Sequence, residues 1–362
     1  MASIRAGHVT AFFLYDVAEA IDLHQVRSLI GGTVTAKPSL KPTPPYVQYQ
    51  QPPVAVDGDI VGMPQLDGFR IRFKMFDYGV ISVALTRPIP ATWPELLARG
   101  LEWHDDTRLS TEAEAFCRRI IDRLRSAMLV PRERFVAEDY LIFAATELND
   151  PLSADTLIAT HGPDIAQLLR GERDPLSGQE RDEVLRHRIS YLATDLVVPT
   201  WNAAFVYDTE PGAQAALEIL EFANSQLLEF RYYDGLLDAQ LARIYAQLQV
   251  ERPLSSWFGR RYNRAARQVH ALFIDINELT DKTENALKIA GDVYAARLFA
   301  LAAARLGLDH WKANVREKLK TVDDIYRFAV EQAAMGRGEM LELTIVLILL
   351  FELVLFFMGI MR

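Results

Sequence analysis

The chain has 362 residues, half of them hydrophobic, and a formal net charge of −9 at pH 7. Because phosphate binding relies on clustered Lys and Arg, an acidic chain without a long basic run is unsuited to general nucleic-acid binding, and we expect no sequence-specific contacts of that kind. The lone cysteine, Cys117, excludes an internal disulfide framework and a cysteine metal cluster, and we expect it to be a small core residue.

Residues 1–210 predict an α+β head domain, because short β-rich runs alternate with helical stretches. In chain order we expect a strand at 8–15, a helix at 22–30, strands at 69–79 and 80–87, helices at 93–103 and 111–128, a strand at 140–148, helical stretches at 153–162 and 163–171, a helix from Ser177, strands at 189–198 and 202–208, and a helix after Pro211. This order suggests a duplicated β-α-β-β-α unit, although the residues of the two halves hardly match.

Two features interrupt the head domain. The segment 36–64 is rich in proline, which opposes helix and central strand, so it predicts a long surface loop or edge arm. Asp77 and Gly79 are predicted turn residues between two strands, since an Asp-x-Gly turn needs a glycine that can adopt positive φ.

Little in the sequence points to catalysis. It contains no phosphate-cradling loop, no His-Glu-x-x-His motif and no nucleophile elbow. The acids available to an enzyme are Asp105 with Asp106, in an expected exposed turn, and Glu138 with Asp139, which point to opposite faces if the chain there is extended. We therefore predict no catalytic, cofactor-binding or metal-binding residue.

Residues 211–338 predict a long helical stalk. Apolar residues at alternating four- and three-residue spacing indicate a coiled-coil seam, and only Thr283 interrupts it. The seam consists of Val269, Leu272, Ile276, Leu279, Ala286, Ala290 and Val293. A stop at Gly307 predicts an antiparallel helical hairpin, with the helix at 213–249 packed against it. Such a seam serves either an intramolecular core or self-association, and we expect a homo-oligomer.

Residues 339–362 predict a C-terminal transmembrane helix. Between 343 and 361 only Thr344, Glu352 and Gly359 are not plainly apolar, and a helix of that length spans about 28 Å, close to a bilayer core. An acid is costly at mid-membrane, so Glu352 is open to three interpretations: helix–helix association within the membrane, a tolerated residue without a role, or ion or proton transport.

The flanks of this span predict its orientation. Only Arg362 follows the span, whereas six basic residues precede it: Lys312, Arg316, Lys318, Lys320, Arg327 and Arg337. The prediction is a tail-anchored, single-pass protein with its body in the cytoplasm. The absence of a transit peptide favours a bacterial cytoplasmic membrane.

The arrangement resembles the DUF155 (RMND1-like) family. The segments that carry the resemblance are FFLYDVAEAIDLHQVRSLI, FKMFDYGVISVAL, LLEFRYYDGLLDAQLARIYAQL, the long heptad helices, and the tail LELTIVLILLFELVLFF. Family members tend to carry a Leu-Asp pair and then a cluster of Pro, Phe and Trp where this chain has Arg231 to Gly235. The resemblance implies a membrane-anchored, oligomerising protein without an established enzymatic activity. Its mitochondrial members are associated with translation, as a tether of ribosomes.

Two functions from different classes follow. The first is a tail-anchored scaffold, whose head and coiled coil self-associate and tether a cytosolic partner, with the ribosome as one candidate. The alternative is a membrane-bound, metal-dependent hydrolase that uses Asp105, Asp106, Glu138 and Asp139. This second function requires a cleft that gathers these carboxylates and shifts their pKa values.

Overall fold

The computed structural model describes residues 3–31, 52–57, 66, 68–90, 92–250 and 293–357. The chain divides into two compact units. The first comprises Met1–Tyr232 with Leu279–Lys312, and the second comprises Tyr233–Glu278 with Ala313–Arg362. The boundary at Tyr232 falls within a continuous helix, so the first unit extends beyond residue 210, where the predicted head domain ends.

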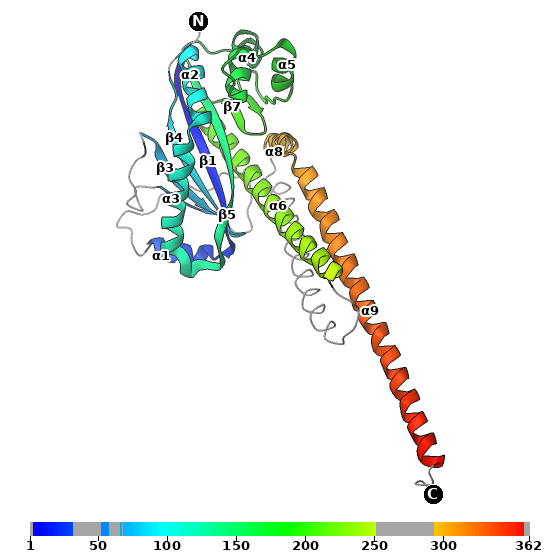
Figure 1. Ribbon diagram of the computed structural model, residues 1–362. Helices are drawn as coiled ribbons and strands as arrows, with labels where there is room; N and C mark the ends of the chain where they lie inside the picture. Colours follow the sequence, from blue (N-terminus) through cyan, green and yellow to red (C-terminus); the bar gives the residue numbers. More distant parts are fainter. Residues whose placement is uncertain are drawn as a thin grey trace. The chain divides into compact units, whose positions relative to one another are not determined.

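The first unit is an α+β structure built on one seven-stranded sheet (Figure 1). Its strands lie in the order β2-β3-β4-β1-β5-β7-β6. Their bounds are β1 (Ile4–Ile21), β2 (Val54–Asp57), β3 (Arg70–Met75), β4 (Val80–Pro88), β5 (Met128–Leu148), β6 (Leu196–Pro199) and β7 (Ala203–Tyr207). All neighbouring strands are antiparallel except β5 and β7, which are parallel. The two longest strands, β1 and β5, pair at the centre.

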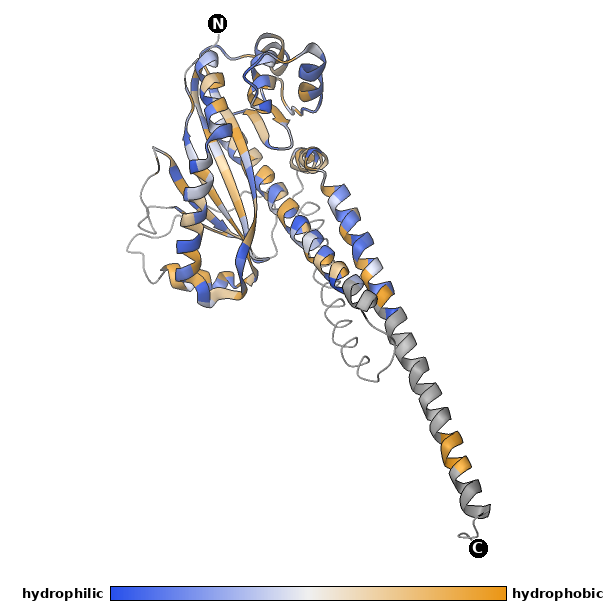
Figure 2. Ribbon diagram, in the orientation of Figure 1, coloured by the Kyte–Doolittle hydropathy of each residue, from blue (hydrophilic) through white to orange (hydrophobic). Residues whose placement is uncertain are grey.

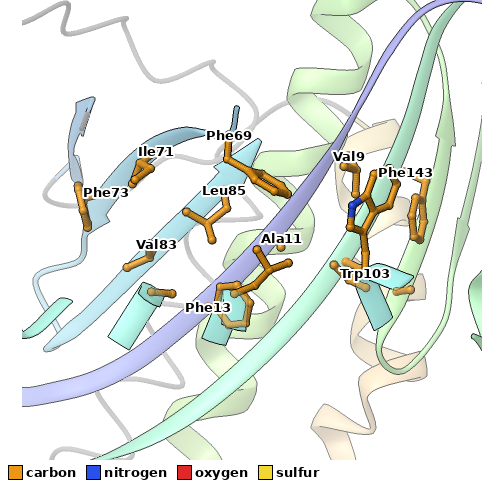
Figure 3. Close-up of a cluster of buried hydrophobic side chains, with 14 of the residues drawn as sticks. Val9, Ala11, Phe13, Phe69, Ile71, Phe73, Val83, Leu85, Trp103 and Phe143 are labelled. Atoms are coloured by element: carbon orange, nitrogen blue, oxygen red, sulfur yellow. The ribbon is translucent and has the colours of Figure 1, made fainter. Parts of the chain in front are cut away.

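One face of the sheet carries the main apolar core. Because successive side chains of a strand point to opposite faces, alternate residues of β1, among them Val9 and Phe13, point the same way as Val83 and Leu85 of β4. Figure 3 shows these residues together with Trp103, which comes from a covering helix. Figure 2 shows how strongly the central strands are hydrophobic.

Five helices of the first unit surround the sheet on this side and at its ends, namely α1 (Leu23–Gly31), α2 (Trp93–Asp105), α3 (Thr107–Leu124), α4 (Ala154–Arg170) and α5 (Gly178–Arg186). All five begin at side-chain caps, since the capping side chain of each accepts a hydrogen bond from a backbone N–H of the first turn; the caps are Asp22, Thr92, Asp106, Ser153 and Ser177. A short 3-10 turn, η2 (Arg125–Ala127), joins α3 to β5.

The opposite face of the sheet is covered by α6 (Glu210–Val250). Every residue of this helix from Ile219 to Phe230 is buried. The helix α8 (Val293–Leu306) packs on α6, with the rings of Phe222 and Phe299 5.7 Å apart. Helix α6 is therefore enclosed between the sheet and α8 over this stretch.

The predicted duplication is present in the order of elements but not in the pairing of strands. In the first half, β4 returns antiparallel beside the long strand β1. In the second half, β7 returns parallel beside the long strand β5. The proline-rich segment 36–64 also contains the edge strand β2, which pairs with β3, whereas most of the segment lies outside the described residues.

The second unit contains the C-terminal part of α6 and most of α9 (Leu308–Phe357). Its described contacts include Lys318, whose ammonium group lies 2.7 Å from a carboxylate oxygen of Asp234 and 2.6 Å from one of Asp238. The two acids are four residues apart and so lie on one face of α6. This shared lysine joins the two helices within the unit.

The predicted transmembrane span at 343–361, together with the single-pass bacterial membrane location, is wrong. A crossing needs about 20 consecutive apolar residues. No helix in the described part of the chain is long and apolar enough to cross a membrane. The predicted contact with the lipid bilayer and the predicted intramembrane association of Glu352 depended on this span, and the side chain of Glu352 lies outside the described residues.

The predicted coiled-coil seam is largely outside the described residues as well. Its members from Val269 to Ala290 fall within 251–292. Val293, its last member, begins α8 with a side chain that is 71% exposed.

Candidate functional site

The face of the sheet beneath α6 is unusual in carrying charged groups. Lys74 of β3 forms an ion pair with Glu221, although only 13% and 4% of the two side chains are exposed. Glu138 of β5 is paired with Arg231 of α6. These contacts fix the position of α6 along the sheet, because a buried charge that loses its partner is costly.

The most deeply buried charge on this face is Asp16. Its side chain is fully buried, and Nε of Arg132 donates to its Oδ1 at 2.8 Å. The same guanidinium donates to the hydroxyl of Tyr232 at 2.7 Å and lies over the Tyr232 ring, 3.8 Å from its centroid. We call Asp16, Arg132 and Tyr232 the Asp16 cluster.

A distortion of the two central strands builds this cluster. The register between β1 and β5 shifts between Asp16 and Ala18, which marks a β-bulge or similar irregularity. Close to the shift, Val130 has φ of 47°, a left-handed conformation that is rare for a β-branched residue. The backbone is therefore strained beside the cluster, as is often seen at functional sites.

The electrostatics of the cluster follow from burial. Burial raises the pKa of Asp16 to about 6, and the charge of Arg132 limits the rise. Within the described structure the Oδ2 oxygen of Asp16 has no hydrogen-bond partner. Burial also raises the pKa of Tyr232, so its hydroxyl stays protonated, and the hydroxyl oxygen accepts the hydrogen bond from Arg132.

The predicted turn residues lie next to this cluster. Gly79 has φ of 94°, and a Cβ atom at its position would lie 2.0 Å from the backbone oxygen of Ala18. The backbone of Val17 donates to the Gly79 carbonyl at 3.0 Å, and that of Ile21 donates to the Asp77 carbonyl at 2.9 Å. The turn between β3 and β4 is thus bonded to the end of β1.

Three of the four carboxylates of the hydrolase hypothesis pair with three different arginines. Asp105 pairs with Arg173, and Asp106 caps α3 and pairs with Arg108. Glu138 is held under α6 by Arg231, while the neighbouring Asp139 lies along the same extended strand. His104 is bonded through Nε2 to the carbonyl of Leu168 at 2.9 Å. Across the described residues no group of three or more His, Cys, Asp or Glu side chains could hold a metal ion.

A second candidate site flanks the edge strand β6. Tyr191 and Leu192 precede this strand with 69% and 62% of their surface exposed, and Trp201 follows it with 64% exposed. We call these three residues the β6 rim. The sequence pattern does not predict the β6 rim, because apolar residues in a strand indicate burial and say nothing of the residues on either side of it. The one available signal is a tryptophan in the turn between β6 and β7.

Both parts of the β6 rim are held by hydrogen bonds. The buried carboxylate of Asp195 accepts from the backbone N–H groups of Tyr191 and Leu192, at 2.7 and 2.5 Å. The turn that carries Trp201 is held by Tyr140, whose hydroxyl donates to the carbonyls of Thr200 and Ala203 at 3.0 and 2.8 Å. The exposed apolar side chains are therefore presented by an ordered backbone.

Comparison with known proteins relates the sheet domain to an archaeal protein. Over 218 residues the chain is 25% identical to "Uncharacterized protein MJ0711" of Methanocaldococcus jannaschii, a match that covers 60% of this chain and 65% of that relative, less than two thirds of its length. No solved structure matches the chain. Residues 6–214, which contain all seven strands except the first two residues of β1, match the model of one family. Because this match spans more than half of the 362 residues, the chain belongs to the family described as "Uncharacterized protein MJ0711, N-terminal domain".

Proposed function

We propose that this protein is a non-enzymatic scaffold that self-associates through its long helices and holds a macromolecular partner against its sheet domain. The observation that carries the proposal is the β6 rim. Exposed aromatic and aliphatic side chains on an ordered backbone are typical of protein interaction sites, where a few such anchors supply most of the binding energy.

The long helices support the self-association. Helix α6 has 41 residues and α9 has 50. Six consecutive residues of α9, Ile345 to Leu350, are apolar, and each is 50–59% exposed. Figure 2 shows this hydrophobic stretch on α9. Because six consecutive residues surround a helix completely, we assign other copies of the chain as the partners that cover them.

We also propose that the protein belongs to the wider DUF155 group, which its opening strand and the Phe76–Val80 turn resemble. That resemblance makes the translation machinery the first partner to test. The alternative enzymatic function gains no support from the separate positions of Asp105, Asp106 and Glu138, which are each engaged by a different arginine.

Co-sedimentation with purified ribosomes tests the partner at the β6 rim. We expect the full chain to sediment with ribosomes in a salt-sensitive way. Replacing Tyr191 and Leu192 together by serine, or Trp201 by serine, should weaken this binding roughly tenfold. The matched control is Leu129→Ser, which removes an equally exposed leucine elsewhere on the domain and should leave binding unchanged.

Two results would contradict the proposed partner. One is wild-type protein that stays in the supernatant at low salt. The other is equal binding by the rim variants and the control, which would move the contact away from the β6 rim.

A further inference from the structure

Four arginines gather at the C-terminal end of α3. They are Arg118, Arg119 and Arg123 of the helix and Arg125, which begins the turn η2, and all four are exposed. The same stretch contains a single acid, Asp122, although the chain as a whole has a net charge of −9. We call these four arginines the arginine face.

The side chains of the arginine face point away from the core. Because an α-helix has 3.6 residues per turn, Arg119 and Arg123 lie one turn apart. Arg118 and Arg125 lie two turns apart on a neighbouring row. The other side of the helix is buried and carries Phe116, Cys117, Ile120, Ile121 and Leu124. Packing of that side on the core therefore directs the arginines outward, at the end of α3 that Figure 1 shows close to α1.

The fold itself does not require all of these cations. The helix macrodipole favours basic residues near a C-terminus, but this effect falls off within the last turn. It accounts for Arg123 and Arg125, whereas Arg118 and Arg119 lie more than one turn before the helix ends at Leu124. Like charges one turn apart, such as those of Arg119 and Arg123, also destabilise a helix. A bound anion removes this repulsion.

Two of the guanidinium groups are positioned by aromatic rings. Arg118 lies over the ring of Phe135, 4.5 Å from its centroid. Arg119 lies over the ring of Phe116, also at 4.5 Å. A guanidinium that is already held over a ring loses less conformational freedom when its N–H groups bind a ligand. These contacts therefore prepare the arginine face for binding.

The charge of the arginine face is only partly neutralised. Glu114 pairs with Arg118, accepting from its Nε at 2.9 Å and its Nη2 at 2.6 Å. In the part of the chain that the structure describes, Arg119 forms no ion pair, and neither does Arg125. Their two positive charges are therefore available to an anionic ligand.

We propose that the arginine face binds the phosphate backbone of single-stranded RNA without reading its sequence. Charge complementarity supports a polyanion as the ligand. Every cation of this stretch is an arginine, whose planar guanidinium binds phosphate oxygens in pairs and stacks on unpaired bases. An anionic membrane surface attracts lysine and arginine alike. Contacts with phosphates carry no sequence information, in keeping with the predicted lack of sequence-specific binding.

This contact goes beyond the proposed function, since it involves neither the β6 rim nor a ribosome. Fluorescence anisotropy of a short, labelled single strand of RNA of mixed sequence measures its affinity for the full chain over a series of salt concentrations. The logarithm of the association constant should fall linearly with the logarithm of the salt concentration, with a slope of about −0.7 for each phosphate that is bound.

The double variant Arg119→Gln with Arg125→Gln should make this slope shallower by about 1.4 and weaken binding about tenfold at about 0.1 M salt. The matched control is Arg5→Gln with Arg173→Gln, which removes the same charge from two exposed positions outside the arginine face. The control should leave both the slope and the affinity unchanged. Circular dichroism checks that both variants are folded.

Ultraviolet crosslinking of the wild type to the same RNA gives a second test that needs no variant. The crosslinked peptides should come from the arginine face. The proposal is overturned if the wild type does not bind RNA at low salt, if both double variants lose the same affinity, or if the crosslinks lie elsewhere. Binding to vesicles of phosphatidylcholine with phosphatidylserine in the absence of RNA binding would instead identify a lipid surface as the ligand and also overturn it. Since the assays contain no ribosomes, their failure is distinct from failure of the proposed function.

Discussion

At Gly79 the backbone conformation and the packing both exclude a side chain. The φ of 94° disfavours any L-residue with a Cβ atom, and such an atom would meet the Ala18 carbonyl at 2.0 Å. We expect Gly79→Ala to lower the free energy of unfolding by at least about 2 kcal/mol, measured by denaturant unfolding. Gly68→Ala is the matched control, since Gly68 also has positive φ but no atom within 4 Å of its Cβ position.

A smaller cost for Gly79→Ala than for Gly68→Ala would show that the approach to Ala18 is not a constraint. This turn could be predicted from the sequence, because the Asp-x-Gly pattern at residues 77–79 is typical of a turn between two strands. It could not predict the contact with Ala18, because that contact joins the turn to a different strand.

The pairing of Asp16 with Arg132 could not be predicted from the sequence. Its partner Arg132 is 116 residues away, and no spacing rule connects an acid in one apolar strand with an arginine in another. We expect its ionisation to affect stability. Because its pKa is raised by burial to about 6, the folded state binds more protons than the unfolded state between about pH 4 and pH 6, so stability should fall as the pH rises.

The contribution of Asp16 is isolated by comparison of two proteins. Over that range the wild type should lose on the order of 2–3 kcal/mol relative to Asp16→Asn, measured by urea unfolding at each pH. Parallel pH profiles of the two proteins would show that Asp16 does not titrate there.

At the scale of elements, β5 and α4 show why sequence patterns mislead. The sequence does not predict a strand in the first half of β5, because Pro131 and the charged residues around it oppose a central strand. In the structure this segment pairs with β1 and is largely exposed. Two helical stretches were expected around Pro163, but α4 continues through this proline. Its buried residues, such as Leu157 and Ile165, hold one continuous helix on the core despite the lost hydrogen bond.

The attachment of α6 to the sheet leads to a prediction about a buried ion pair. Removing one partner leaves the other charge buried, so Lys74→Met alone should lower the free energy of unfolding by about 3 kcal/mol. The double variant Lys74→Met with Glu221→Leu should recover most of this loss, because two apolar side chains pack without uncompensated charge.

A double-mutant cycle from denaturant unfolding gives the coupling of this pair. If the loss in free energy of unfolding of the double variant equals the sum of the losses of the two single variants, the ion pair contributes nothing specific to the position of α6. The exposed pair Arg5 and Glu147 is the natural control, with an expected coupling near zero.

At the scale of the whole molecule, the α+β class could be predicted from the alternation of strands and helices, and the sheet confirms it. The membrane location was wrong, since it depended on the apolar composition of residues 343–361 alone. The strand order was not predictable, because the parallel pairing of β5 with β7 and the central pairing of β1 with β5 join segments far apart in sequence.

The scaffold function is tested most directly by the mass and composition of the particle recovered through a tag on the N-terminus of the full chain. We expect a homo-oligomer by light scattering that carries ribosomal proteins and RNA at low salt and loses them as the salt concentration rises. A monomer recovered without ribosomal components at low salt would contradict both the self-association and the proposed partner.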